Sequence, residues 1–167
     1  MNLIVDTQKL TANIGAKSYR VAIGSGGAVD AALKREGDKK TPLGTFPVRE
    51  VWYRADRRAR PITDLPVHVI AETDGWCDDA NLPEYNTHVT LPFSGSHEKL
   101  WREDEIYNLV LVIGHNDAPV VPGLGSAVFV HIARPSYTGT EGCIALAEKD
   151  LEEILACLTK ESMIEIV

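Results

Sequence analysis

The sequence has few cysteines, no long apolar run and no concentration of positive charge. Only three cysteines occur among 167 residues, Cys77, Cys143 and Cys157, and none forms a Cys-x-x-Cys pair. Three thiols cannot all be paired, and their spacing is unlike that of a disulfide framework. A zinc or redox motif built on paired cysteines is not expected either. At least one thiol is therefore free.

Targeting and membrane-spanning segments are also missing. No stretch approaches the roughly 18 apolar residues that a membrane span requires. The first residues, Met1–Asp6, lack the charged region and apolar stretch of a secretory signal. We therefore expect no membrane segment and a cytoplasmic location, or a periplasmic or cell-wall location if a signal has been removed.

Charge argues against polyanionic partners. The net charge is −7, the calculated pI is near 5.2, and the most basic stretch, residues 54–60, itself contains an aspartate. Nucleic acid and anionic membrane surfaces are therefore not expected as partners. With 44% hydrophobic and 25% charged residues, the chain has the composition of a folded protein, and its length predicts a single domain over residues 1–167.

Short apolar runs separated by turn-forming residues predict a mainly β fold. The expected strands lie at residues 3–5, 19–23, 45–52, 107–113, 127–132, 143–146 and 163–167, with a short helical turn at 28–35. Residues 148–158 carry apolar side chains at helical spacing and predict one amphipathic helix near the C-terminus. Residues 54–105 hold scattered prolines and predict a loop-rich middle insertion with short strands. We expect a β-sandwich or barrel.

The segment Thr140-Glu141-Gly142-Cys143 carries the clearest chemical signal. A nucleophilic cysteine needs access, a thiolate and donors for the oxyanion that forms on attack. Glycine directly before the cysteine allows close approach of a substrate and leaves the Gly142 and Cys143 amides as oxyanion donors. We therefore predict that Cys143 is a nucleophile; the alternative is a small buried apolar residue.

His131 is the expected base. It stands twelve residues before Cys143 at the end of an apolar strand, and a loop then returns the chain to the cysteine. If the strands on either side of that loop are neighbours, the imidazole can take the thiol proton. The alternative is a structural histidine with its hydrogen bonds satisfied within the fold. Cys77 and Cys157 are expected to be inert.

Together these residues resemble a known family. Val128–His131 followed by Thr140–Ile144 is similar to the L,D-transpeptidase (YkuD-like) signature, a strand histidine and then Ser/Thr-His-Gly-Cys. Residues 37–46, Gly-Asp-Lys-Lys-Thr-Pro-Leu-Gly-Thr-Phe, resemble the Gly-x-x-x-Thr-Pro-x-Gly-x-Phe loop of the same family. The resemblance covers residues 17–52 and 107–167.

The resemblance implies an L,D-transpeptidase β-sandwich that acts on peptidoglycan stem peptides without a cofactor. Cys143 would attack the L,D bond between diaminopimelate and D-alanine and form a thioester, while His131 takes and returns the proton. Two positions depart from the family pattern: Glu141 replaces the expected histidine, and Ala145 replaces the expected arginine or asparagine. These departures affect how substrate and acceptor are held.

Three residues are candidates for substrate binding. Glu141 could bind a substrate ammonium, and Arg134 could hold the terminal carboxylate of a tetrapeptide. His115 follows a buried strand and could line the same cleft or cap the turn. No metal site is expected, because His88 and the pair His97-Glu98 lack metal-ligand spacing.

Three functions remain open at this point. The favoured one is an L,D-carboxypeptidase that trims D-alanine from soluble tetrapeptide fragments, or muropeptides, during wall recycling. The second is an L,D-transpeptidase that cross-links the wall. The third is a peptidoglycan-binding module in which Glu141 and Ala145 mark a decayed catalytic site.

Overall fold

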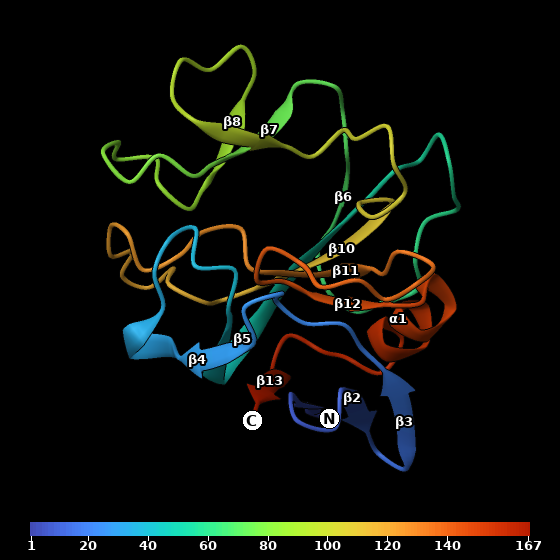
Figure 1. Ribbon diagram of the computed structural model, residues 1–167. Coiled ribbons are helices and arrows are strands. Elements are labelled where there is room, and N and C mark those ends of the chain that lie inside the picture. The colour runs from blue at the N-terminus through green and yellow to red at the C-terminus, as the bar shows by residue number, and fades with distance from the viewer.

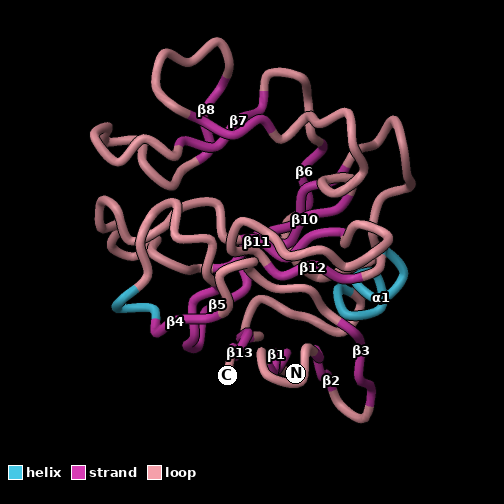
Figure 2. Tube along the Cα trace, viewed as in Figure 1, coloured by secondary structure: helices cyan, strands magenta, loops and turns pink.

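The computed structural model describes residues 1–167 and consists mainly of short strands (Figure 1). The strands of the body are β1 (Leu3–Asp6), β2 (Thr11–Ile14), β3 (Lys17–Arg20), β4 (Ala28–Asp30), β5 (Thr41–Tyr53), β10 (Leu109–Ile113), β11 (Phe129–Ile132), β12 (Ile144–Leu146) and β13 (Met163–Ile166). The middle of the chain adds β6 (Val67–Val69), β7 (Asp74–Cys77), β8 (His88–Thr90) and β9 (His97–Lys99). The helices are the 3-10 helix η1 (Ala31–Leu33) and α1 (Glu148–Leu155). Loops join these elements (Figure 2).

One long strand joins the two halves of the main sheet. The sheet runs in the order β12-β11-β10-β5-β13-β1-β2-β3, and β4 and β6 also pair with β5. The first part of β5 pairs with β13 at Gly44–Pro47, and its second part pairs with β10 at Val48–Tyr53. The two halves share one apolar core, to which β1, β10, β11, β12, β13 and α1 all contribute. The mainly β fold with one C-terminal helix is as the sequence predicts.

Side-chain alternation gives the inner strands two different faces. In β10, Leu109 and Leu111 enter the main core, whereas Val110 and Val112 enter a second apolar cluster on the opposite face. In β11, Val130 enters the main core, and Phe129 belongs to the second cluster. Because successive residues of a strand point to opposite faces, odd positions of β11 share the face of Phe129.

The second face is covered by the middle of the chain. Strands β8, β7 and β9 form a separate three-stranded sheet, residues 74–99, which we call the lid. The lid lies beyond β10 and β11, on the opposite side from α1 and the termini (Figure 1). Trp76 of the lid packs edge-to-face on Phe129, with ring centroids 5.1 Å apart. The expectation of short strands and long loops over residues 54–105 is confirmed.

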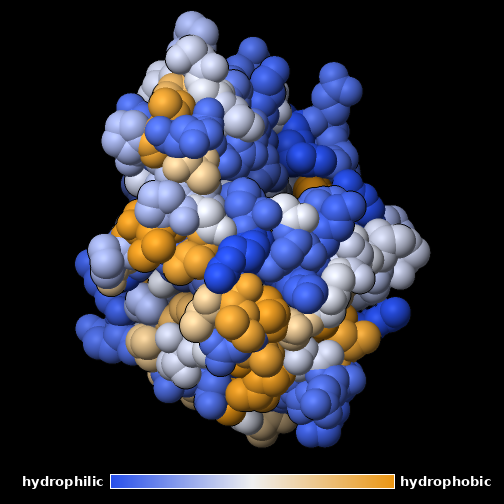
Figure 3. Space-filling view, turned by 60° about the vertical axis from the view of Figure 1, so that its left-hand side comes forward, coloured by the Kyte–Doolittle hydropathy of each residue, from blue (hydrophilic) through white to orange (hydrophobic).

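The helix α1 closes the main core from the other side. Leu151, Ile154 and Leu155 are fully buried, as the helical spacing predicts, while Glu148 and Asp150 occupy the first turn, where acidic side chains favour the helix dipole. The helix ends at Leu155, earlier than the predicted residue 158. No helix has the length and apolar character needed to cross a membrane. On the face shown in Figure 3, apolar residues gather in the lower half and the upper part is mostly hydrophilic.

Two local predictions near the N-terminus differ from the structure. Residues 28–35 form the short strand β4 and then η1, because Ala28–Asp30 pairs in parallel with Thr41–Leu43. The strand expected at residues 19–23 is shorter: β3 ends at Arg20, where its hairpin with β2 ends. Both differences are caused by strand pairing, which the local sequence pattern does not reveal.

Replacing Ile154 with alanine should destabilise the fold by about 2–5 kcal/mol, because it opens a cavity in a fully buried position between α1 and the sheet. The matched control Lys149→Ala lies on the exposed side of the same helix and should change stability by less than about 0.5 kcal/mol. Urea unfolding followed by circular dichroism measures both changes. Equal losses in the two variants would contradict the assigned helix orientation.

Candidate active site

Strand pairing brings Cys143 and His131 to one face of the sheet. Strands β11 and β12 are parallel, with Val130 opposite Ile144 and His131 opposite Ala145. Cys143 directly precedes β12 and belongs to the second apolar cluster, on the face that Phe129 and His131 share. Both residues line one cavity of about 430 Å³ between the body and the lid.

The turn that carries Cys143 is held by backbone hydrogen bonds to residues 22–25. The amide of Ala22 donates to the carbonyl of Ala145, 2.8 Å away, and the Ala145 amide donates back over 2.9 Å. The Ser25 amide donates to Thr140, and the Thr140 amide donates to Ile23. These bonds fix both ends of the turn relative to the body.

Gly142 is required by the shape of this turn. Its φ is +134°, a conformation that L side chains rarely adopt, and a Cβ would lie 2.9 Å from the Lys40 carbonyl oxygen. Its amide donates to Thr140 Oγ1 over 3.1 Å. The Gly142 amide is thus engaged within the turn, which corrects the expectation that it donates to the oxyanion. The Cys143 amide makes no hydrogen bond within the protein and is free to donate to a bound ligand.

The Cys143 thiol is buried and neutral. Only 8% of the residue is exposed, and Sγ donates to the Ala127 carbonyl at 3.2 Å while it accepts from the Phe129 amide at 3.4 Å. Burial, followed by the nearby charge of Glu98, raises the pKa of the thiol to about 12. The Phe129 amide and the Lys34 ammonium act in the opposite direction and lower this pKa.

His131 is held in the tautomer that a base requires. Its Nδ1 lies 3.0 Å from the Ile132 carbonyl oxygen, which can only accept, so Nδ1 carries the proton and Nε2 keeps a lone pair. Burial lowers the pKa of the imidazole to about 4. The ring packs edge-to-face with Tyr107 at 5.3 Å, and the Tyr107 hydroxyl donates to Glu98 of the lid. The base is therefore neutral at physiological pH and fixed in orientation.

The cavity carries charges of both signs. Among the residues that line it are the cationic side chains Lys34, Arg102 and Arg134 and the acidic side chains Glu36, Asp78, Glu98 and Glu141. Arg102 is paired with Asp104 through two hydrogen bonds of 2.8 and 2.7 Å. The buried Asp78 Oδ1 has no hydrogen-bond partner. A cavity with this lining suits a ligand that has both ammonium and carboxylate groups.

The three predicted substrate-binding residues have different surroundings. Glu141 and Arg134 line the cavity, with side chains 82% and 50% exposed, so they lie at its mouth. Arg134 is 3.4 Å from Asp104, which already pairs with Arg102. The prediction for His115 is wrong, because this residue does not line the cavity. It packs edge-on against Phe46, and its Nε2 donates to the Leu124 carbonyl over 2.9 Å.

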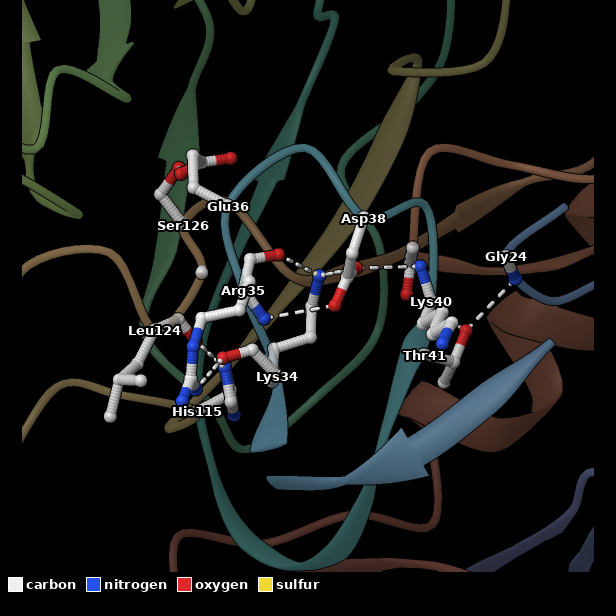
Figure 4. Close-up of polar contacts among 12 residues, drawn as sticks. Gly24, Lys34, Arg35, Glu36, Asp38, Lys40, Thr41, His115, Leu124 and Ser126 are labelled. Carbon is white, nitrogen blue, oxygen red and sulfur yellow. Dashed lines mark hydrogen bonds and ion pairs between the residues drawn. The ribbon is translucent and has the colours of Figure 1, made fainter. Parts of the chain in front are cut away.

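Several cavity residues gave no signal in the sequence. Lys34 is buried next to Gly142, with its ammonium bonded to Asp38 and to the Arg35 carbonyl (Figure 4). Tyr107 and Glu98 reach the site from the start of β10 and from the lid. Only tertiary pairing brings these segments together. Two sequence patterns point to further residues of the site. One is the alternation of residues 107–113, and the other is the position of Thr41 within the family-like loop of residues 37–46.

Comparison with known proteins identifies the family of the chain. A sequence model of the L,D-transpeptidase catalytic domain (YkuD) matches residues 3–166. The chain belongs to this family. No curated protein matches the chain. Among solved structures, it is similar to that of Mycobacterium tuberculosis L,D-transpeptidase 1, with 15% identity and a TM-score of 0.46 over 99% of this chain. The match spans 57% of that protein's chain.

Family membership gives the site its chemical class. L,D-transpeptidase catalytic domains act on peptidoglycan stem peptides. In this member, the resting pair is a neutral thiol and a neutral imidazole, since burial disfavours the charged form of each. Neither residue carries a charge in this resting state, and the Cys143 amide has no partner within the protein.

This neutral resting state predicts the pH dependence of alkylation by iodoacetamide. The thiolate is the reactive form, so the rate at Cys143 should rise about ten-fold per pH unit from about pH 6 to about pH 10 without a plateau. Peptide mapping in a Cys157→Ser background removes the exposed thiol from the measurement. A plateau near neutral pH would show a preformed thiolate–imidazolium pair and contradict the neutral resting state.

Proposed function

We propose that this domain cleaves the L,D bond between diaminopimelate and D-alanine in peptidoglycan stem peptides through a thioester on Cys143. The observation that carries the proposal is the placement of Cys143 and His131 on one strand face, lining one cavity. His131 Nε2 takes the thiol proton as Sγ attacks the carbonyl carbon. The C–N bond then breaks, the proton passes to the departing amine, and D-alanine leaves.

The second half-reaction decides between two activities. Water attacking the thioester releases a tripeptide, which is L,D-carboxypeptidase activity on tetrapeptide fragments. Cationic side chains in the cavity support this activity, because Lys34 and Arg134 offer partners for the free carboxylate of a terminal D-alanine. We favour it as the main activity.

The transpeptidase reaction is the second candidate. It needs an amine acceptor, which is protonated before it binds. The acidic wall of the cavity supports this candidate, because Glu36, Asp78 and Glu98 would attract an ammonium group, and the buried Asp78 Oδ1 has no other partner. Once this ammonium has given a proton to His131, the free amine attacks the thioester carbon, the C–S bond breaks, and the cross-link forms as the Cys143 sulfur takes a proton back.

Mass spectrometry of a disaccharide-tetrapeptide incubated with the domain tests the proposal. We expect loss of one alanine with the wild type and none with Cys143→Ala. His131→Gln should slow the reaction by about 10²–10⁴-fold, because it removes the general base. A tripeptide without dimers indicates the carboxypeptidase, and dimers joined through diaminopimelate indicate the transpeptidase.

Variants at the cavity mouth separate substrate binding from chemistry in the same assay. Arg134→Ala and Glu141→Gln should raise KM with little change in kcat, because both side chains lie at the mouth and are largely exposed. Equal KM values in wild type and variants would remove these two residues from substrate binding. An unchanged tetrapeptide with every protein would contradict the proposal and favour a non-catalytic binding module.

A further inference from the structure

One buried hydroxyl links three segments that meet behind the nucleophile. Thr41, the first residue of β5, is fully buried, and its Oγ1 donates to the Gly142 carbonyl oxygen over 2.9 Å. The same oxygen accepts from the Gly24 amide, also at 2.9 Å. Figure 4 shows Thr41 and Gly24 joined in this way beside the loop of Asp38 and Lys40. The hydroxyl thus uses both its donor and its acceptor capacity inside the protein.

The partner of this hydroxyl is the peptide group that precedes the nucleophile. The Gly142 carbonyl and the Cys143 amide belong to one planar trans peptide, in which C=O and N–H point in opposite directions. A bond from Thr41 to the carbonyl therefore directs the Cys143 amide away from the buried interior. The Cys143 amide has no partner within the protein, and both residues of the peptide line the cavity.

No other side chain of the protein hydrogen-bonds to this peptide group. The Gly142 amide and the Cys143 carbonyl on either side are both bonded to Thr140 Oγ1, at 3.1 and 2.6 Å, and this fixes the turn but leaves the plane between them free to rotate. A glycine on one side makes such rotation easier, since Gly142 has no Cβ to restrict its ψ. The bond from Thr41 removes that freedom.

The loop before Thr41 is itself fixed in place. Asp38 accepts hydrogen bonds from the Lys34 ammonium and from the amides of Arg35 and Lys40, the last two at 2.9 and 2.8 Å (Figure 4). The Lys40 carbonyl oxygen lies in the space that a Cβ on Gly142 would occupy. The loop and the turn that carries Cys143 are therefore in direct contact. A shift of either would break the hydrogen bond from Thr41 to the Gly142 carbonyl oxygen.

We propose that Thr41 is a positioning residue for acyl transfer, which orients the Gly142–Cys143 peptide so that the Cys143 amide receives the oxyanion. This role rests on the proposed function of Cys143 as the nucleophile. Thr41 does not contact the reacting atoms. It acts through the peptide, by holding a single donor in place before the substrate arrives.

Two reactions of the same sulfur test this role. Acylation of Cys143 by an activated ester such as p-nitrophenyl acetate passes through an oxyanion, whereas alkylation by iodoacetamide displaces iodide without one. Both are measured on the Cys157→Ser background in wild type, Thr41→Val and Thr41→Ser. Valine keeps the branched shape and removes the hydroxyl, and serine keeps the hydroxyl.

Thr41→Val should slow acylation by at least about ten-fold. The loss should not exceed about 10²–10³-fold, which is the usual effect of removing an oxyanion donor completely. Its alkylation rate should stay within about two-fold of wild type, because thiolate formation does not use the Cys143 amide. Thr41→Ser should acylate at close to the wild-type rate. On the tetrapeptide, the valine variant should lower kcat and leave KM nearly unchanged.

Wild-type acylation by Thr41→Val would overturn the positioning role and leave the proposed function intact. An equal slowing of acylation and alkylation would also overturn it, because that result indicates a general disturbance of the thiol. Failure of the wild type to acylate at Cys143 would contradict the nucleophile itself, and with it the role of Thr41. The ester contains no peptidoglycan, so these results do not depend on which natural substrate is correct.

Discussion

The site depends on one geometric constraint, the two-residue repeat of β11 and β12 in a parallel pair. Because β11 and β12 are in register at Val130 and Ile144, the residue before each of these, Phe129 and Cys143, falls on the opposite face. His131 shares that face. A shift of one residue in either strand would turn Cys143 or His131 into the main core. The apolar side chains that fill the core from these strands thus also hold Cys143 and His131 in position.

The lid determines the electrostatic surroundings of Cys143 and His131. It buries the face that carries the thiol and the imidazole, and burial is the largest cause of both pKa changes. Both groups therefore rest in the neutral form, since burial disfavours the charged form of each. The His131 imidazole has a fixed tautomer, and the Cys143 amide has no hydrogen-bond partner within the protein.

The placement of Cys143 and His131 at one cavity was predictable because its signals are local. An apolar strand ending in His131, a loop and a Gly-Cys step are all visible in the sequence, and so is the spacing of helix α1. The prediction for His115 is wrong because the turn after β10 directs its side chain toward Phe46. His115 stands two residues after Ile113, which faces the main core, and it packs there on Phe46.

Long-range contacts account for what the sequence could not show. The strands of the lid have three or four residues each, too few to establish a period. Glu98 and Lys34 approach Cys143 only through the packing of the lid and of the loop before β5. The hydrogen bond from the Gly142 amide to Thr140 Oγ1 depends on the shape of the turn, so the sequence did not predict it. Side-chain identity did not contain that information.

The proposed role of Cys143 as the nucleophile can be tested by trapping the covalent intermediate. The domain is mixed with a tetrapeptide, quenched in acid within the first turnover, and analysed as intact protein and as peptides by mass spectrometry. We predict one adduct with the mass of the tripeptide acyl group, on Cys143 and not on Cys77 or Cys157. Release of alanine without any adduct on Cys143, or an adduct on another cysteine, would contradict the assignment of the nucleophile.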